Sequence, residues 1–215
     1  MRIGVLGTGV VGKTVATKLV KLGHEVRMGS RSAGGDKAKA WMKEAGGKST
    51  EGTFAAAAAF GEMVFNCTSG TSSLDALRSA GANNLKGKIL VDVANPLDSS
   101  RGMPPVLSVC NTDSLGEQIQ KAFPEAKVVK SLNTVAAAVM VEPSLLPGVH
   151  TMFVSGNDSG AKSEVINLLK TGFGWPEVMD LGDITGARGQ EMYLALWLRL
   201  YTRLQTPNLN IRVVK

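Results

Sequence analysis

The chain has 215 residues, of which 44% are apolar and 20% charged, and its formal net charge is +6. This composition is typical of a globular protein that is long enough to bury one substantial core. Only 5% of the residues are aromatic and lysine and arginine form no dense block, so we expect no nucleic acid partner. No apolar run approaches the ~20 residues of a membrane-spanning helix, so we expect no membrane partner either.

The cysteines and histidines predict neither a disulfide framework nor a metal site. Cys67 and Cys110 lie far apart, and His24 and His150 are not at metal-ligand spacing from them. The sequence opens directly into a strand pattern instead of the segments of a signal peptide. These features predict a cytoplasmic protein.

The first thirty-two residues have the pattern of a strand–helix–strand unit that binds a dinucleotide. A strand at 2–6 leads into a glycine turn, a helix at 14–22 and a second strand at 25–28. The turn contains Gly7, Thr8, Gly9, Val10, Val11 and Gly12. In such a unit the first glycine permits the turn, the second leaves room for a pyrophosphate and the third lets the helix pack closely on the strand. Amides at the helix start then hold the phosphates.

A second motif overlaps the first. Residues 7–14 also read GxxxxGK[ST], the phosphate loop of nucleotide triphosphatases, and the apolar run 89–91 followed by Asp92 resembles their magnesium-binding strand. The middle glycine, Gly9, argues against this interpretation, because a phosphate loop has no need for it. A phosphate-loop triphosphatase is therefore the alternative to a dinucleotide-binding enzyme.

The end of the second strand favours NADP over NAD. An NAD enzyme usually places a carboxylate there, but this chain has Ser30, Arg31 and Ser32 and no carboxylate before Asp36. A carboxylate would repel a 2′-phosphate, whereas an arginine binds it through two charge-assisted hydrogen bonds. Lys37 would add a second positive charge.

Strands and helices alternate along the rest of the chain. We expect further strands at 48–51, 63–67, 88–92, 127–131, 151–155 and 177–180, further helices at 36–45, 53–59, 74–80, 114–123, 161–171 and 187–203, and an extended tail at 209–214. This alternation predicts an α/β fold, a Rossmann-type doubly wound and mainly parallel sheet. We expect one domain over residues 1–215, with the core sheet in 1–180 and a helix and tail in 181–215.

Ligands of such sheets bind beyond the carboxyl ends of the strands. This rule selects the glycine turn after the first strand and residues 30–32 after the second strand. It also selects residues 66–70, Asn95 and residues 133–137. We expect Asn133 and Thr134 to hydrogen-bond the edge of a ring and backbone groups at Ala137 to hold a nicotinamide carboxamide. No catalytic side chain is predicted, because hydride transfer between two stacked rings needs no nucleophile and often no base.

Little chain remains outside the sheet, so the acceptor site is expected to be open or completed by a second subunit. An open site suits a flat, flavin-like acceptor better than a small acid, with Arg101 as a candidate clamp for an anionic tail. In the last helix, Leu194, Trp197, Leu198 and Tyr201 share one face, which predicts core packing or the seam of a homodimer. The scarcity of catalytic side chains also leaves open an NADPH-sensing protein without activity.

Four segments resemble the NADPH-dependent oxidoreductases related to coenzyme F-420–NADP oxidoreductase, and also the reductase domains of the STEAP metalloreductases. The segments are RIGVLGTGVVGKTVATKLVKLGHEVRMGSRS, ILVDVANPLDSSRG, VVKSLNTVAAA and EMYLALWLRLY. The resemblance implies NADP contacts at residues 8–11, Ser30, Arg31, Lys37, Asn66, Gly70, Ala94 or Asn95, and Ala137. It further implies a deazaflavin over the nicotinamide. Where the archaeal enzyme has His-Thr-Ile-Pro, this chain has Asn-Thr-Val-Ala at 133–136, so the hydride partner stays open between coenzyme F-420 and a flavin (FMN or FAD).

Overall fold

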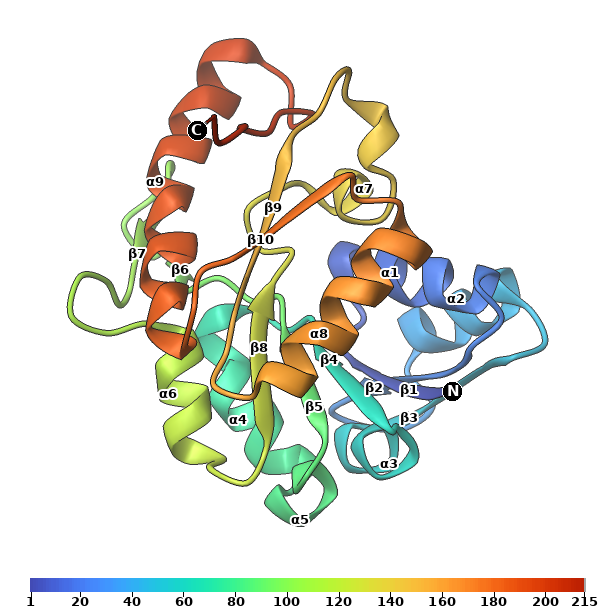
Figure 1. Cartoon of the computed structure of the whole chain (residues 1–215). Helices are drawn as coiled ribbons and strands as arrows, with labels where there is room; N and C mark the ends of the chain where they lie inside the picture. Colours follow the sequence, from blue (N-terminus) through green and yellow to red (C-terminus); the bar gives the residue numbers. More distant parts are fainter. Residues whose placement is uncertain (215) are drawn as a thin grey trace.

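One eight-stranded sheet organises the chain, and a computed structural model describes residues 1–214 (Figure 1). The sheet order is β10-β9-β8-β5-β4-β1-β2-β3. Its strands are β1 (Arg2–Leu6), β2 (Glu25–Ser30), β3 (Ser49–Thr53), β4 (Met63–Asn66), β5 (Ile89–Asp92), β8 (Lys127–Ser131), β9 (Thr151–Ser155) and β10 (Glu177–Asp180). Every neighbouring pair is parallel except β8 and β9. The prediction of a doubly wound, mainly parallel sheet is confirmed.

Helices cover both faces of this sheet. They are α1 (Val10–Lys21), α2 (Asp36–Ala45), α3 (Phe54–Phe60), α4 (Gly70–Ala80), α5 (Ala82–Leu85), α6 (Leu115–Ala122), α7 (Ala137–Val141), α8 (Ser159–Asn167) and α9 (Ala187–Leu204). Short helical turns occupy η1 (Pro143–Leu145), η2 (Leu168–Phe173) and η3 (Ile184–Gly186). Helices α1, α2, α7 and α8 bury their apolar residues in one core cluster, and α3 to α6 bury theirs in a second.

The strands supply alternate residues to these two cores. In β4, Met63 and Phe65 belong to the first core, whereas Val64 between them belongs to the second. Successive side chains of a strand point to opposite faces, so a strand covered on both faces is apolar throughout. This explains why the central strands read as continuous apolar runs and were recognisable in the sequence.

The alternation of strands and helices along the chain did not predict the direction of β9. It follows α7, a helix of five residues, which at 1.5 Å per residue spans about 8 Å. That is roughly half the ~16 Å length of a five-residue strand such as β8. No helix long enough to cover a strand lies between β8 and β9, and β9 runs antiparallel to β8, with Lys130 opposite Ser155.

Several local elements differ from the sequence-based expectation. Helix α1 begins at Val10, inside the glycine turn, and α4 begins directly after Ser69, each four residues earlier than expected. Residues 97–107, for which neither strand nor helix was expected, contain a small antiparallel hairpin, β6 (Leu97–Asp98) and β7 (Val106–Leu107). α5 and α7 were not anticipated, because helices this short carry too little periodicity to be seen in a sequence.

The chain leaves the sheet after Asp180 and ends in α9 and a tail. α9 packs against α6 and β9. The tail forms no strand within the described residues but contacts β9, with Thr151 N–H donating to Ile211 O (3.0 Å). The assignment of residues 1–215 to one domain stays a prediction, and Lys215 lies outside the described residues.

Candidate cofactor and acceptor site

Two cavities meet at the carboxyl ends of the parallel strands. The first, here called the loop cavity, has a volume of about 460 Å³, and the second, the tryptophan cavity, about 330 Å³. The loop cavity is lined by Gly7, Thr8, Gly9, Ser30, Arg31, Phe54, Cys67, Thr68, Ser69, Ser72, Asp75, Ala76 and Ser79. The tryptophan cavity is lined by Val11, Cys67, Thr68, Ser69, Gly70, Val93, Ala94, Asn95, Leu97, Asn133, Val135, Ala136, Ala137, Met140, Leu194 and Trp197. Cys67, Thr68 and Ser69 line both, so the cavities form one elongated site.

The glycine turn brings the start of α1 to the loop cavity. Gly7 has φ +118°, a conformation that favours glycine. A Cβ on Gly12 would lie 2.1 Å from Gly7 O, so the helix approaches the turn as closely as only glycine permits. A Cβ on Gly9 would meet nothing within 4 Å, which leaves the backbone there open to a ligand.

The start of α1 is suited to an anion. Gly9, the N-cap residue, provides no side-chain hydrogen bond, and the first turn contains no acidic residue. The first amides of a helix lack partners within the helix and carry the positive end of its dipole. A phosphate bound there would satisfy these amides.

Arg31 is the cationic residue at the end of β2. It lines the loop cavity, is exposed and forms no salt bridge with residues 1–214. The turn that carries it is held in place: Ser30 Oγ donates to Ser32 O (2.6 Å), and Gly34 N–H donates to the Glu51 carboxylate (2.9 Å to Oε2). The guanidinium is therefore available to a ligand on a fixed backbone.

Four of the residues predicted at the glycine turn and beyond the end of β2 line neither cavity. Val10 is 75% exposed on the outer side of α1, and Gly12 is buried against the turn. Ser32 and Lys37 are exposed on the surface beyond Ser30 and Arg31. The structure thus separates Arg31, which faces the cavity, from Lys37, which does not line it.

Asn66 and Thr134, also predicted as contacts, are buried beneath the site. Asn66 Nδ2 donates to Asp92 Oδ1 (2.8 Å), while Asn66 Oδ1 accepts from Thr68 Oγ1 (2.7 Å). Asn66 therefore positions Thr68, and Thr68 itself lines both cavities. Thr134 lines neither cavity.

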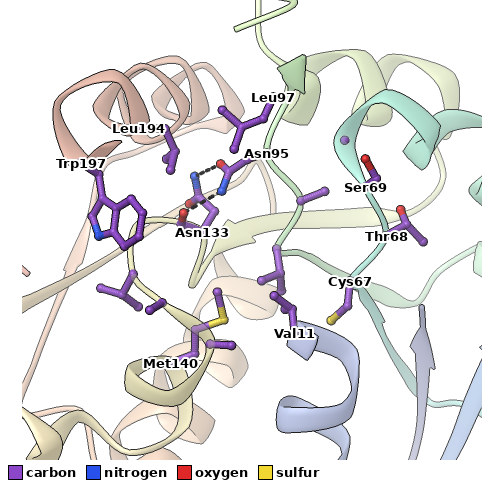
Figure 2. A pocket seen from close by; sticks show the side chains of 16 residues that line it. Val11, Cys67, Thr68, Ser69, Asn95, Leu97, Asn133, Met140, Leu194 and Trp197 are labelled. Atoms are coloured by element: carbon purple, nitrogen blue, oxygen red, sulfur yellow. Dashed lines mark hydrogen bonds between the residues drawn. The ribbon is translucent and has the colours of Figure 1, made fainter. Parts of the chain in front are cut away.

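The tryptophan cavity has a mainly apolar lining (Figure 2). Leu194 and Trp197 project from α9 and lie across the cavity from Thr68 and Ser69. Leu97 and Met140 complete the apolar wall. The predicted contacts Val11, Gly70, Ala94, Asn95 and Ala137 all line it. Trp197 also stacks on Tyr201, with ring centroids 5.5 Å apart, which holds the indole in a fixed orientation.

Asn133 lines this cavity, but its side-chain amide is already engaged. Asn133 Nδ2 donates to Asn95 Oδ1 (2.9 Å) and to Gln190 O (3.1 Å), and its Oδ1 accepts from Gln190 Nε2 (3.3 Å). The residue is 1% exposed. The side chain therefore has no free donor for a ring, and it holds Asn95 and α9 in place; the ring contact expected of Asn133 stays a prediction.

A buried charge cluster attaches α9 to the sheet. Lys130 Nζ lies 2.8 Å from Asp92 Oδ2 and 2.8 Å from Glu191 Oε1, and all three side chains are at most 1% exposed. Glu191 also accepts from the amides of Leu115 (2.8 Å) and Gly116 (3.0 Å) at the start of α6. Burial alone would lower the pKa of Lys130, but the two carboxylates raise it, so the lysine stays charged. This cluster sets the position of Leu194 and Trp197.

The geometry excludes the phosphate-loop alternative. Residues 10–12 are helical instead of forming a loop around a phosphate. Lys13 lies in a separate groove with Lys18 and Lys21. Asp92 is buried in its ion pair with Lys130, so it is not available to magnesium.

The sequence selected the segment that joins the two cavities, residues 66–70, but assigned no role to Cys67, Thr68 or Ser69. Cys67 is 8% exposed, and burial raises the pKa of its thiol. Thr68, Ser69 and Asp75 belong to no sequence motif. Thr68 and Ser69 do lie in the segment that was selected because it follows the carboxyl end of a strand. Trp197 was assigned to a packing or dimer stripe, because only the folded chain brings α9 to the strand ends.

No helix within residues 1–214 combines the length and apolar character required to cross a bilayer. In the same described part of the chain, no three or more His, Cys, Asp or Glu side chains are grouped as metal ligands.

Known proteins resemble this chain at several levels. Residues 2–96 match the family model described as NADP oxidoreductase, coenzyme F-420-dependent. A crystal structure from Arthrobacter sp. FB24, provisionally described as an F-420-dependent NADP-reductase, is 53% identical, covers 100% of both chains and has a TM-score of 0.95.

The metalloreductase STEAP3 of Rattus norvegicus is 32% identical over 216 residues, which are 97% of this chain. This chain spans only 38% of STEAP3. A structure of the reductive aminase from Aspergillus terreus with NADPH and ethyl levulinate has a TM-score of 0.67 at 19% identity and covers 95% of this chain and 62% of its own. That last similarity shows a shared fold alone.

Proposed function

Because this chain belongs to the family of coenzyme F-420-dependent NADP oxidoreductases and is an NADP-dependent oxidoreductase, we propose that it transfers hydride between the nicotinamide and a flat, flavin-like ring. The ring would be that of the deazaflavin coenzyme F-420 or of a flavin such as FMN or FAD. The observation that carries the proposal is the tryptophan cavity, an apolar site that shares Cys67, Thr68 and Ser69 with the loop cavity.

In the proposed complex the adenosine half of NADP(H) occupies the loop cavity. Arg31 binds the 2′-phosphate, with Ser30 beside it. The amides at the start of α1 receive the pyrophosphate, and Gly9 leaves room for it. Thr68 and Ser69 lie where the two halves meet, which directs the nicotinamide into the tryptophan cavity near Ala137.

The protein then has to align two rings and exclude water, and its apolar lining suits both tasks. NADPH bound there would supply a hydride from its nicotinamide ring, and the acceptor ring would take up that hydride together with a proton. Leu194, Trp197 and Met140 provide flat or apolar surface for the acceptor. Close stacking with the correct orientation supplies most of the catalysis that such a reaction needs.

The test is an acceptor screen under anaerobic conditions. NADPH oxidation is followed with coenzyme F-420, FMN, FAD, quinones and ferric chelates, using the wild type, Trp197→Ala and Leu196→Ala. Leu196 is the neighbouring residue of α9 and is 54% exposed, so it controls for changes in the helix. We expect turnover with a deazaflavin or flavin, a large loss in Trp197→Ala and none in Leu196→Ala. Turnover confined to quinones or ferric chelates would contradict the proposed acceptor.

We further propose that two copies of the chain associate through the C-terminal half of α9 in the cytoplasm. Tyr201 is 42% and Leu204 56% exposed there, and exposed apolar residues gathered on one surface typically mark an interface. Sedimentation of the wild type and of Leu204→Glu tests this. A wild type that sediments as a monomer at micromolar concentration would contradict it.

A further inference from the structure

The loop cavity has a polar wall that the contacts proposed above leave without a role. Ser72, Asp75 and Ser79 line this cavity from α4. They stand three and four residues apart, so they share one face of the helix, and all three are exposed. Arg31 and Asp75 are the charged residues among the described residues that line the cavity. A guanidinium and a carboxylate therefore face the same ligand space.

These two charged residues reach the cavity from different strands. Arg31 follows β2, whereas Asp75 lies in α4, which follows β4. In the sheet β1 lies between β2 and β4, and its end carries the glycine turn. Phe54 of α3, a helix that packs against both β2 and α4, adds apolar surface to the lining. This lining suits a flat molecule with an anionic group at one end and a hydrogen-bond donor at the other.

The carboxylate of Asp75 is held in place with one oxygen left for a ligand. Arg78 Nη1 donates to Asp75 Oδ1 (2.8 Å) from the next turn of α4. Arg78 itself does not line the cavity. Within residues 1–214 no donor pairs with the other oxygen, Asp75 Oδ2. The side chain of Asp75 is 82% exposed, so a molecule in the loop cavity can reach this oxygen.

A carboxylate beside a polyanionic cofactor is unfavourable unless it meets a hydrogen-bond donor. In the proposed complex Arg31 binds the 2′-phosphate and the start of α1 receives the pyrophosphate. The donors of the adenosine half are then the ribose 3′-hydroxyl and the 6-amino group of adenine. The hydroxyl is next to the 2′-phosphate, whereas the amino group lies at the far edge of the base. The amino group, which has two N–H bonds and no charge, is therefore the partner that suits Asp75.

We propose that Asp75 is a specificity-determining residue that recognises the adenine base of NADP(H), with Oδ2 accepting a hydrogen bond from the 6-amino group. Phe54 and Ala76 provide apolar surface for the base. Hypoxanthine and guanine carry a carbonyl oxygen at this position, which would meet the carboxylate oxygen without a proton between them. This inference rests on the proposed placement of the adenosine half in the loop cavity and is independent of which acceptor is reduced.

The matched probes are NADPH and its hypoxanthine analogue, in which a carbonyl oxygen replaces the 6-amino group. Both keep the 2′-phosphate and the fluorescent reduced nicotinamide, so the same fluorescence titration of the full-length chain measures both. We expect the wild type to bind NADPH at least about fivefold more tightly, because the hydrogen bond is charge-assisted but lies at an exposed carboxylate. Asp75→Asn should bring the two affinities within about twofold, since an amide can turn either its N–H or its oxygen to the base.

Arg78→Ala is the matched control, because it removes the same ion pair as Asp75→Asn but keeps the carboxylate. It should retain the preference for NADPH. Equal affinities of the two probes in the wild type, or an undiminished preference in Asp75→Asn, would overturn the role of Asp75 and leave the proposed hydride transfer intact. Binding of neither probe would overturn the placement of the cofactor and this inference with it.

A crystal of the chain with NADPH provides a direct check. We expect the adenine N6 atom within hydrogen-bond distance of Asp75 Oδ2. A base whose amino group points away from α4 would overturn the inference. By contrast, a preference for NADPH that disappears in Asp75→Asn, together with no turnover of any flavin or deazaflavin, would support the role of Asp75 and contradict the proposed acceptor.

Discussion

Asn95 and Asn133 hold each other across the carboxyl end of the sheet. Asn133 Nδ2 donates to Asn95 Oδ1 (2.9 Å), and Asn95 Nδ2 donates to Asn133 O (2.8 Å). The two residues follow β5 and β8, and the pair is linked through Gln190 to α9. The pair therefore fixes three walls of the tryptophan cavity relative to one another (Figure 2).

Asn133→Ala should weaken binding of the acceptor more than binding of NADPH. The substitution leaves Asn95 Oδ1 and Gln190 O without their donor, at a cost of about 1–3 kcal/mol for each buried group. We expect a lower Tm and a raised KM for the acceptor, while the Kd of NADPH changes by less than about threefold. Asn84→Ala, which removes one hydrogen bond to Ala80 O (2.8 Å) away from the site, is the control. An equal loss of NADPH affinity would show that Asn133 serves the cofactor.

Arg31→Ala should weaken NADPH but not NADH. Losing a hydrogen bond to a charged group costs about 1.5–3 kcal/mol, which is roughly a tenfold to 150-fold increase in Kd. NADH lacks the 2′-phosphate and should bind as before. The comparison is made by fluorescence titration of both cofactors, with Lys37→Ala as the control, because Lys37 is exposed and does not line the cavity. Parallel losses for NADPH and NADH would rule out the assigned role.

Gly9→Ala and Gly12→Ala should fail in different ways. A Cβ at Gly12 would lie 2.1 Å from Gly7 O, so Gly12→Ala must shift α1 from the turn, and we expect a clear fall in Tm. A Cβ at Gly9 meets nothing within 4 Å, so Gly9→Ala should have the Tm of the wild type. It should nevertheless bind NADPH more weakly, because the added methyl group occupies the space of the proposed pyrophosphate. Thermal unfolding with and without NADPH separates the two effects. If Gly9→Ala bound NADPH as tightly as the wild type, the proposed position of the pyrophosphate at this turn would be wrong.

Glu117 should contribute to stability above pH ~4.5 and lose that contribution in acid. Hydrogen bonds from Arg188, with Nε 2.8 Å from Glu117 Oε2, lower the pKa of Glu117 below its usual 4.5. A carboxyl whose pKa is lower in the fold than in the unfolded chain stabilises the fold above the unfolded pKa. That contribution disappears as the pH falls below 4.5 through the folded pKa.

The check on Glu117 is the free energy of unfolding, measured by urea titration between pH 7 and pH 3. Glu117→Gln should be less stable than the wild type at pH 7, and its stability should fall less steeply in acid. Other carboxyls with lowered pKa values, such as Asp158, remain in the variant and account for the slope that persists. Parallel pH curves for both proteins would show that the pair with Arg188 contributes nothing.

The sequence by itself determined the strands of the sheet and the glycine turn. Both depend on neighbours along the chain: the apolar run at β1, the glycine spacing 7, 9 and 12 and the serines around Arg31 act within one strand–helix–strand unit. Local periodicity and local backbone geometry are visible in a single sequence. The same holds for the parallel direction of β1 and β2, because the crossover helix between them leaves few other arrangements.

Only the tertiary structure decided which side chains are free to bind a ligand. Asn133 looks available in the sequence, but contacts with Asn95 and Gln190 use its amide. The sequence pattern assigns Trp197 to core packing or a dimer seam. In the folded chain the Lys130–Glu191 ion pair brings α9, which carries Trp197, to the carboxyl ends of the strands. Both outcomes depend on pairings between residues far apart in the chain. Since such pairings form only when the whole chain folds, no local pattern encodes them.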